Sequence, residues 1–346
     1  MRVSSQQLEA FITRALVAAG ISGAESKSIA ELMARADLNG ADGHGVFRLP
    51  QYVRRIKGGA VNLKPDIRVE REAPGMALID GDNGMGHLVM RFATEKAIEK
   101  AKSAGVAWVG VKWSNHAGPA SLYASMPIAH DMIGLYLAVG NANHLPAWGG
   151  IDMLLSTNPI AVGVPAGAEP PIVLDMATTV AAYGKVKTAA QRGEAMPEGW
   201  MIDREGRPLT DPRRADEGFL LPIGGYKGYG LALVFGLLAG TLNGAAMGRD
   251  VVDFNHDDTT PTNTGHAIVA ISLAAFGDVA DFKRRVDELV RDIRASKRLP
   301  GVDAIRLPGE QSHAKHEERM RLGIPLPDPL LKSLNQLAAG LGIAGL

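Results

Sequence analysis

Val106-Ala107-Trp108-Val109-Gly110-Val111 is a short apolar run with the length and composition of a buried β-strand. It follows a helical pattern over residues 87–104, and a second strand-like run, residues 76–79, precedes that pattern. Strands that alternate with helices are typical of α/β proteins. The other strand-like runs of the chain are residues 133–139, 159–164, 172–174 and 266–271.

Helical patterns are found near both ends of the chain. Residues 5–19 and 25–38 repeat apolar side chains at helical spacing and predict a helical hairpin. Pro50 suits the first turn of a helix, so we expect a short helix over residues 51–56 and an irregular stretch over residues 43–49. Two later helices are predicted: residues 231–241, nearly all apolar and therefore expected to be buried under the sheet, and residues 281–297, with an apolar stripe of Phe282, Val286, Leu289, Val290 and Ile293.

The composition excludes several classes of protein. Lys and Arg together number 37, as do Asp and Glu, so the net charge of zero does not favour binding to nucleic acid or to an anionic membrane. Cysteine is absent, which excludes disulfides and a thiolate nucleophile. The most apolar stretch, residues 231–238, is shorter than the roughly 20 residues of a membrane span, and the N-terminus lacks an apolar signal core. We expect a globular, cytoplasmic protein.

His44 and Arg48 form the first candidate site. A glycine on each side leaves the backbone around His44 open, and Arg48 follows four residues later. Imidazole exchanges protons near neutral pH, and a guanidinium binds a carboxylate through two parallel hydrogen bonds. The pair therefore predicts proton transfer to or from an anionic substrate. Tyr52 either extends the same surface or is a half-buried helix residue.

Two further polar residues follow strand-like runs. His116 lies in Ser114-Asn115-His116-Ala117-Gly118, and it either contacts the substrate or caps the helix that follows. Asp175 ends the run 172–174, where an unpaired carboxylate is costly to bury. The partner of Asp175 is either His44, whose protonated form it would then support, or a backbone N–H at a helix N-terminus.

A glycine-rich segment around Lys227 predicts contact with a phosphate. In Gly224-Gly225-Tyr226-Lys227-Gly228-Tyr229-Gly230, backbone N–H groups and one positive charge can approach an anion together. The one G-x-G-x-x-G match, residues 340–345, lies behind a helix and does not open one, so neither a Rossmann domain nor a P-loop is supported. No metal is predicted, because convincing ligand spacing is lacking in both candidate groups, His313-His316-Glu317 and His256-Asp257-Asp258.

Several independent motifs occur in a fixed order along nearly the whole chain. They are Gly45-Val46-Phe47-Arg48-Leu49-Pro50 after His44, Ser114-Asn115-His116, Trp148-Gly149-Gly150, Ser156-Thr157-Asn158-Pro159-Ile160, Val173-Leu174-Asp175-Met176-Ala177-Thr178, Leu221-Pro222-Ile223-Gly224-Gly225-Tyr226-Lys227-Gly228 and Arg306-Leu307-Pro308-Gly309-Glu310. In this order they resemble the type-2 malate/L-lactate dehydrogenases, a family that also contains ureidoglycolate, sulfolactate and diketogulonate oxidoreductases and cyclic imino-acid reductases.

The resemblance implies a fold and a reaction. The fold is α/β, with a non-Rossmann, mixed and largely antiparallel sheet flanked by helices and with a mainly helical second domain. Residues 1–72 and 276–346 would form the helical domain, and residues 73–275 the cofactor-binding and catalytic domain. The reaction is hydride transfer between NAD or NADP and C2 of a small 2-hydroxy or 2-keto acid similar to malate or lactate, catalysed by a homodimer.

The resemblance also assigns roles by matched position. His44 would exchange a proton with the substrate oxygen, Arg48 would bind the substrate carboxylate, and His116 would lie on the substrate side. Asp175 would support His44. The catalytic residues would thus be His44, His116 and Asp175, and Arg48, Tyr52 and His116 would bind the substrate. The cofactor would contact Ile172, Val173, Leu174, Asp175, Met176, Ala177, Tyr226, Lys227, Gly309 and Glu310.

The chain departs from the family pattern at three places. Gly43 stands where the family usually has serine, so a complete serine-histidine-aspartate relay is absent. Residues 138–141 replace a Thr-Asn-Ser-like stretch, and His144 is an additional polar residue. These differences leave the identity of the substrate undetermined. The alternatives are a reductase of pyrroline- or piperideine-2-carboxylate, and a binding homologue with impaired catalysis.

Overall fold

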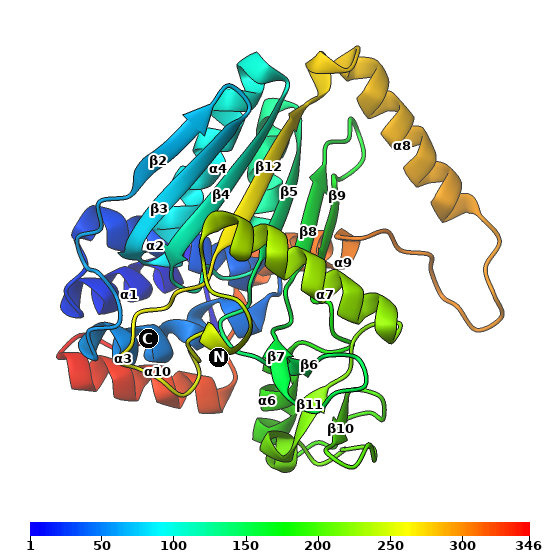
Figure 1. The fold of residues 1–346 in the computed structure, drawn as a ribbon. Coiled ribbons are helices and arrows are strands. Elements are labelled where there is room, and N and C mark those ends of the chain that lie inside the picture. Colours follow the sequence, from blue (N-terminus) through cyan, green and yellow to red (C-terminus); the bar gives the residue numbers. More distant parts are fainter.

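A seven-stranded sheet forms the centre of the protein in the computed structural model, which describes residues 1–346 apart from the side chain of Gln191 (Figure 1). The strands lie in the order β2-β3-β4-β12-β5-β8-β9. Every strand-like run predicted from the sequence overlaps one of them, whereas β2 was not predicted. Their bounds are β2 Arg68–Ala73, β3 Met76–Gly84, β4 Val106–Ser114, β5 Met132–Ala138, β8 Ile160–Val164, β9 Ile172–Met176 and β12 His266–Ser272.

The sheet is mixed and largely antiparallel, which confirms the expected fold class. Only β3 and β4 run parallel, because the helix α4 (Gly86–Ala104) connects them. The other five neighbouring pairs are antiparallel. Strand β12 inserts between β4 and β5, and its first residue, His266, pairs with Val111 on one side and Ala138 on the other. His266 therefore lies in the middle of the sheet, next to the C-terminal ends of β4 and β5.

Helices cover the two faces of the sheet unequally. Because side chains alternate along a strand, Tyr136 and Ala138 of β5 pack toward α4 and α5 (Ser121–Ser125), whereas Leu135 and Leu137 face the opposite side. On that opposite side the helix α7 (Tyr226–Ala239) crosses the sheet near one end (Figure 1).

The expectation that the apolar helix over residues 231–241 is buried was wrong in part. Only one face of α7 is covered, with Ala239 packed on the sheet and Ala232 packed on Leu145 and Leu155. Its other face exposes Leu231, Val234 and Leu237, each with about two fifths to one half of its surface in contact with water. A helix that is apolar all round and covered on one side leaves an apolar surface without a partner in the monomer.

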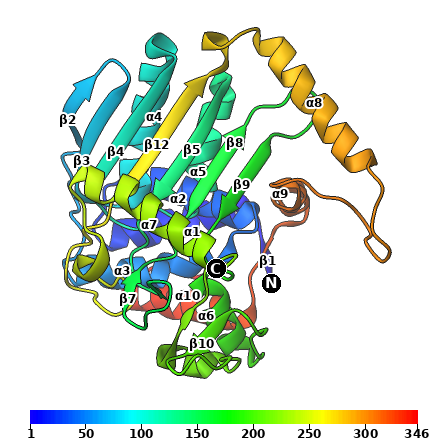
Figure 2. The ribbon, with the colours of Figure 1, turned by 45° about the vertical axis from the view of Figure 1, so that its right-hand side comes forward.

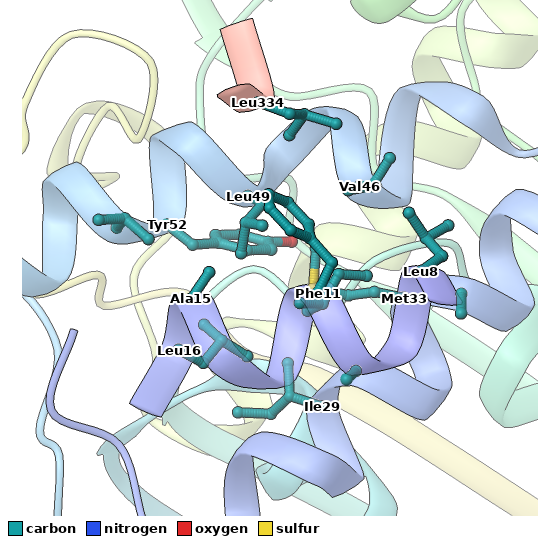
Figure 3. Packing of buried hydrophobic residues seen from close by; sticks show 14 of the residues in the cluster. Leu8, Phe11, Ala15, Leu16, Ile29, Met33, Val46, Leu49, Tyr52 and Leu334 are labelled. Carbon is teal, nitrogen blue, oxygen red and sulfur yellow. The ribbon is translucent and has the colours of Figure 1, made fainter. Parts of the chain in front are cut away.

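The N-terminal helices form a second core together with the C-terminal helix. The predicted hairpin is present as α1 (Ser5–Ala18) and α2 (Gly23–Leu38), and α1 begins with a capping box at Ser4. Phe11, Leu49, Tyr52 and Leu334 are among the side chains of this core, so α3 (Leu49–Lys57) and α10 (Asp328–Leu341) pack on the hairpin (Figure 3). A short sheet of β1 (Arg2–Val3) and β13 (Ile324–Pro325) joins the two ends of the chain.

The connection between α2 and α3 is more regular than expected. The segment predicted to be irregular contains two turns of 3-10 helix, Asp42–His44 and Val46–Arg48. Arg48 then leads directly into α3, with Pro50 in the first turn as predicted.

A small lobe below the sheet was not predicted from the sequence. It consists of α6 (Tyr183–Arg192), β10 (Met201–Asp203) and β11 (Gly218–Leu220), and it has its own core around Val186, Met201 and Leu220 (Figure 1). A two-stranded sheet of β6 (Leu145–Pro146) and β7 (Met153–Leu155) lies beside this lobe.

The helix α8 (Val279–Ala295) projects from the far end of the sheet, and an extended connection leads from it to α9 (Glu310–Leu322) (Figure 2). Asp287 anchors α8, because its carboxylate accepts hydrogen bonds from the backbone N–H groups of residues 167–169. Of the predicted apolar stripe, only Val290 is fully buried, and Leu289 is 54% exposed. Among the described residues, no helix is long and apolar enough to cross a membrane.

Candidate active site

Arg48 is held rigidly beside His44. The Arg48 side chain is buried, and its guanidinium donates from Nε to Gly43 O at 2.9 Å and from Nη1 to Gln51 Oε1 at 2.8 Å. Gln51 in turn donates to Phe254 O at 2.8 Å, which ties this helix to the loop after residue 250. Among the described residues, the second terminal nitrogen of Arg48 has no hydrogen-bond partner, and Arg48 lines a cavity together with His44.

Three aromatic rings are stacked at this cavity. The rings of His44 and His116 lie nearly parallel, with 5.7 Å between their centroids and 14° between their planes. Phe254 covers the other face of His116 at 5.2 Å and 17°. His116, which follows β4, therefore lies beside His44 although 72 positions separate them in the sequence.

Tyr52 and the backbone determine which nitrogen of His116 carries the proton. The Nδ1 atom of His116 lies 2.6 Å from Tyr52 Oη and accepts the Gly118 N–H at 3.4 Å. Because Gly118 N–H can only donate, Nδ1 is an acceptor, and Tyr52 donates to it as well. The neutral ring consequently carries its proton on Nε2. Tyr52 is fully buried behind His116 and reaches the cavity only through that ring.

A second hydrogen-bonded chain reaches the cavity at Tyr136 and His266. Ser114 Oγ donates to Asn115 O, and His266 Nε2 lies 3.1 Å from Ser114 Oγ. This arrangement makes Nε2 the donor nitrogen of His266, so Nδ1 accepts the proton of Tyr136 Oη at 2.7 Å. The oxygen of Tyr136 then faces the cavity as an acceptor.

Burial keeps the histidines of this site neutral. Loss of water around His44, together with the positive charge of Arg48, lowers the pKa of His44 to about 4. Burial and the Arg48 charge also hold the pKa of His116 well below its usual value, and burial lowers the pKa of His266 to about 4. The same desolvation raises the pKa of Tyr52, so its phenol keeps its proton.

The cavity is open to solvent, and its empty volume is about 780 Å³ when the open mouth is included. It lies where β4, β5 and β12 meet the turn after α2. Its principal side chains are those of His44, Arg48, His116, Tyr136, His144, Ser156, Tyr183, Phe254, Asn255 and His266.

The segments matched to a cofactor converge at the outer edge of the sheet. Strand β9, which contains Ile172 to Met176, is the last strand, and its Val173 N–H donates to Pro308 O at 3.1 Å. This bond places Gly309 and Glu310 next to β9. A Cβ at Gly309 would approach the Val173 backbone to 3.0 Å, so the close packing requires glycine there.

The start of α7 reaches the same edge. Ile223 N–H donates to Thr178 O just after β9, and Gly224 and Gly225 follow with φ of 58° and 65°. This turn leaves Tyr226 63% exposed and Lys227 exposed beside it. Exposed aromatic and cationic side chains next to an edge strand and open glycine backbone are a donor set that fits the phosphates and rings of a dinucleotide.

Asp175 occupies a different place from the one expected. Strand β9 continues to Met176, so Asp175 lies within the strand and not at its end. Its Oδ2 accepts the N–H of Ser121, the first residue of α5, at 2.9 Å. Of the two partners considered for this carboxylate, the one found is the helix N-terminus. Among the described residues, Asp175 and His44 share no hydrogen bond.

The sequence patterns missed several cavity residues. His266 and Tyr136 lie in apolar strands, and we interpreted each of them only as part of its strand. The histidine at the start of the run 266–271 could have indicated a site residue. Tyr183 and Asn255 come from the unpredicted lobe and from a loop. Within the part of the chain that the structure describes, no group of three or more histidines or carboxylates is arranged to hold a metal ion.

Comparisons with known proteins agree with this geometry. Residues 3–335 match the model of the malate/L-lactate dehydrogenase family. The solved structure of malate dehydrogenase from Pyrococcus horikoshii superposes with a TM-score of 0.91 at 36% identity and covers 100% of this chain and 97% of that one. A malate/(S)-sulfolactate dehydrogenase from Methanothermus fervidus is 37% identical over 99% of both chains. A Δ1-pyrroline-2-carboxylate/Δ1-piperideine-2-carboxylate reductase from Pseudomonas syringae pv. tomato is 33% identical over 97% of this chain and 96% of its own.

The fold and the cavity therefore define an oxidoreductase of small organic acids that uses a nicotinamide cofactor without a Rossmann domain. The chain belongs to the malate/L-lactate dehydrogenase family. This membership confirms the expected family and the expected class of enzyme, a dehydrogenase that acts on a 2-hydroxy acid.

Proposed function

We propose that the protein transfers a hydride between NAD or NADP and C2 of a small 2-hydroxy or 2-keto acid of the malate or lactate type. The observation that carries the proposal is the placement of His44, Arg48 and His116 on one cavity, with His44 stacked on His116. A proton donor and a carboxylate-binding group next to each other are what this reaction needs from the protein. A bound nicotinamide supplies the hydride in reduction and accepts it in oxidation.

Arg48 orients the substrate in this mechanism. Its fixed guanidinium binds the C1 carboxylate, which places the C2 oxygen near the ring of His44. His116, whose Nε2 carries the proton, donates a hydrogen bond to the substrate and polarises it without changing its own charge. The rigid partners of both side chains mean that little reorganisation is needed at the moment of reaction.

His44 exchanges the proton. In the free protein its low pKa keeps the ring neutral, which is the form required of a base in oxidation. In that direction His44 removes the proton of the C2 hydroxyl while the hydride leaves C2, and in reduction it returns the proton to the C2 oxygen. A substrate carboxylate bound at Arg48 neutralises the charge that helps to lower the pKa of His44, so substrate binding itself favours protonation.

The outer edge of the sheet is the proposed cofactor site. Its residues are Ile172 to Ala177 with Tyr226, Lys227, Gly309 and Glu310, and exposed donors there support dinucleotide binding. Either NAD or NADP is compatible with this site. Asp175 is proposed as a positioning residue at this site, since its bond to Ser121 fixes β9 against α5.

A screen of reduced-nicotinamide absorbance tests the proposal. NADH and NADPH are each combined with pyruvate, oxaloacetate, larger 2-keto acids and cyclic imino acids, and the reverse reactions are followed with the hydroxy acids. Replacing His44 by alanine should lower turnover about 10²–10⁴-fold while cofactor binding, followed by fluorescence, persists. Unchanged turnover in that variant removes the assigned role of His44.

The alternative is reduction of a cyclic imino acid, which the similarity to the Pseudomonas syringae reductase supports. Gly43 bears on this choice, because a Cβ at this position would have nothing within 4 Å and a serine therefore fits. If the missing hydroxyl limits that activity, Gly43→Ser should raise turnover of pyrroline-2-carboxylate relative to pyruvate. Binding of NADH without turnover of any acid in the screen would favour the other alternative, a binding homologue.

We further propose a homodimer located in the cytoplasm. The outer face of α7 supports the dimer, because Leu231, Val234 and Leu237 form an exposed apolar row. The projecting α8 and the connection after it also expose apolar side chains, with Leu289 54% and Leu299 77% exposed. Light scattering of the protein and of a Val234→Asp variant should give a dimer and a monomer, respectively.

A further inference from the structure

A buried carboxylate lies directly under the turn that carries His44 and Arg48. Asp37, near the end of α2, is 3% exposed, and its Oδ2 accepts the N–H of Val46 at 2.8 Å. The carboxylate also touches Gly45 so closely that a Cβ there would lie 2.2 Å from Oδ1. The backbone between His44 and Val46 therefore rests on Asp37, and only glycine allows this contact.

A second group holds the other end of the same turn from a distant part of the chain. Arg319 of α9 is buried, and its Nη1 donates both to the backbone oxygen of Asp37 and to the carboxylate of Asp42. Its Nη2 donates to Asp42 Oδ2 at 3.2 Å. Arg319 is thus bonded to α2 and to the first residue of the turn at the same time.

These contacts leave the turn little freedom. Asp42 is fixed by Arg319, Val46 is fixed by Asp37, and His44 lies between these two attachment points. Arg48 follows Val46 by two residues and is tied back to Gly43 within the turn. We infer that Asp37 and Arg319 are positioning residues, which fix the turn so that His44 and Arg48 meet the substrate together.

The inference rests on the proposed function, since it concerns the acid–base and carboxylate-binding groups of that reaction. Asp37 and Arg319 do not line the cavity among the described residues, so they act on the reaction only through the turn. A displacement of about 1 Å in a reacting group can lower the rate about 10²-fold. Loss of either anchor should therefore affect turnover more than cofactor binding.

Two pairs of variants test the inference. Asp37→Ala leaves the Val46 N–H without its acceptor, whereas Asp37→Asn keeps an oxygen at that place. Arg319→Met removes all donors, whereas Arg319→Lys keeps a positive charge near Asp42. We expect kcat to fall about 10–100-fold in Asp37→Ala and Arg319→Met, with partial recovery in the two conservative variants and with less than a twofold change in the Kd of NADH.

Arg321→Met is the matched control, because Arg321 lies on the same helix two residues further on and is exposed. Its kcat should equal that of the wild type. A lower melting temperature in Arg319→Met, with unchanged kcat per folded molecule, would show that the anchor is merely structural and would overturn the inference. If Asp37→Ala does not fold, the Arg319 pair decides.

A readout without turnover separates this inference from the proposed function. The ring signals of His44 in an NMR spectrum, assigned with His44→Gln, should change position in Arg319→Met and remain unchanged in Arg321→Met. If the wild type reduces no acid in the screen, the proposed reaction fails, but the His44 signals still test the anchoring. Identical His44 signals in the wild type and Arg319→Met overturn it.

Discussion

The ring of His144 lies face to face with the ring of Tyr183, with 4.0 Å between centroids and 13° between planes. The two rings line the cavity of His44 and also a second, open cavity, which extends toward the small lobe. They therefore form the partition between the two spaces. Burial lowers the pKa of His144 to about 4, so this part of the partition is uncharged at neutral pH.

Removal of this partition should widen the range of substrates. In His144→Ala the two cavities join, and we expect kcat/KM for 2-keto acids with long or aromatic side chains to rise at least tenfold relative to pyruvate. Steady-state rates with pyruvate, 2-oxohexanoate and phenylpyruvate measure this ratio. His256→Ala is the control, because His256 lines only the second cavity and its loss leaves the stacked pair in place. An unaltered ratio in His144→Ala would show that the rings do not limit substrate size.

The low pKa of His44 predicts opposite pH profiles for the two directions of the reaction. Oxidation requires the neutral ring, so its kcat/KM should stay level from pH 8 to about 5 and decrease only as the pH approaches about 4. Reduction requires the protonated ring, so its kcat/KM, which reports the pKa of the free enzyme, should fall about tenfold per pH unit above about 4. Samples held at each pH and assayed at pH 7 control for unfolding. If both pH profiles change slope near pH 6.5, the pKa of His44 is not lowered by burial, and the assignment is contradicted.

Tyr52→Phe tests the fixed tautomer of His116. Without the phenol, Nδ1 keeps only the long bond from Gly118, so the proton is free to occupy either nitrogen. We expect kcat/KM to fall roughly 5–10-fold, which corresponds to about 1 kcal/mol for one lost hydrogen bond, while Tm changes little. A double variant with His116→Ala should show no additional loss from Tyr52→Phe, since Tyr52 acts through His116. Additive losses would indicate an independent role of Tyr52.

Arg48→Lys tests the carboxylate-binding role. Lysine keeps the positive charge, but it cannot form two parallel hydrogen bonds or reproduce the bonds to Gly43 and Gln51. KM for the 2-keto acid should rise about 10–100-fold, a loss of about 1.4–2.7 kcal/mol, with a smaller effect on kcat. The Kd of NADH serves as the control and should stay within a factor of two. An unchanged KM would exclude Arg48 as the group that binds the carboxylate.

Local sequence patterns predicted the helices and strands better than they predicted how these elements pack and pair. Apolar runs such as 106–111 and the hairpin near the N-terminus were visible because strand and helix periodicity depend on neighbouring residues. The insertion of β12 between β4 and β5 depends on pairing across more than a hundred residues, which no local pattern records. The partly exposed α7 shows the same limit, since hydropathy indicates that a surface is apolar but not whether this chain covers it.

The site was predictable to the extent that it depends on residue type. His44 and Arg48 were identified from chemistry and from their spacing, and His116 from its position after a strand. The anchors Asp37 and Arg319 were not identified, because an aspartate in a helix and an arginine among charged residues resemble ordinary surface residues until the fold buries them. The partner of Asp175 was likewise undetermined, since only the structure places Ser121 beside it.

His87→Leu should stabilise the protein, and more so in acid. The His87 ring is fully buried, and neither of its nitrogens has a hydrogen-bond partner among the described residues. Leaving such groups unpaired costs about 1–3 kcal/mol. Replacing the ring by an apolar side chain of similar length should therefore raise the free energy of unfolding by about 1–2 kcal/mol at pH 7. Thermal unfolding followed by circular dichroism measures this difference.

The pH dependence of that difference follows from the pKa of His87, which burial lowers from 6.5 to about 3. Between these two values the unfolded chain binds a proton that the folded protein does not, so the wild type loses stability as the pH falls through this window. The leucine variant lacks this loss, and its advantage in Tm should grow from pH 7 to pH 4. His130→Leu, at an exposed histidine outside the core, should show no such growth. A constant difference in Tm for His87→Leu across that range would mean that His87 is protonated, or reached by water, in the folded state.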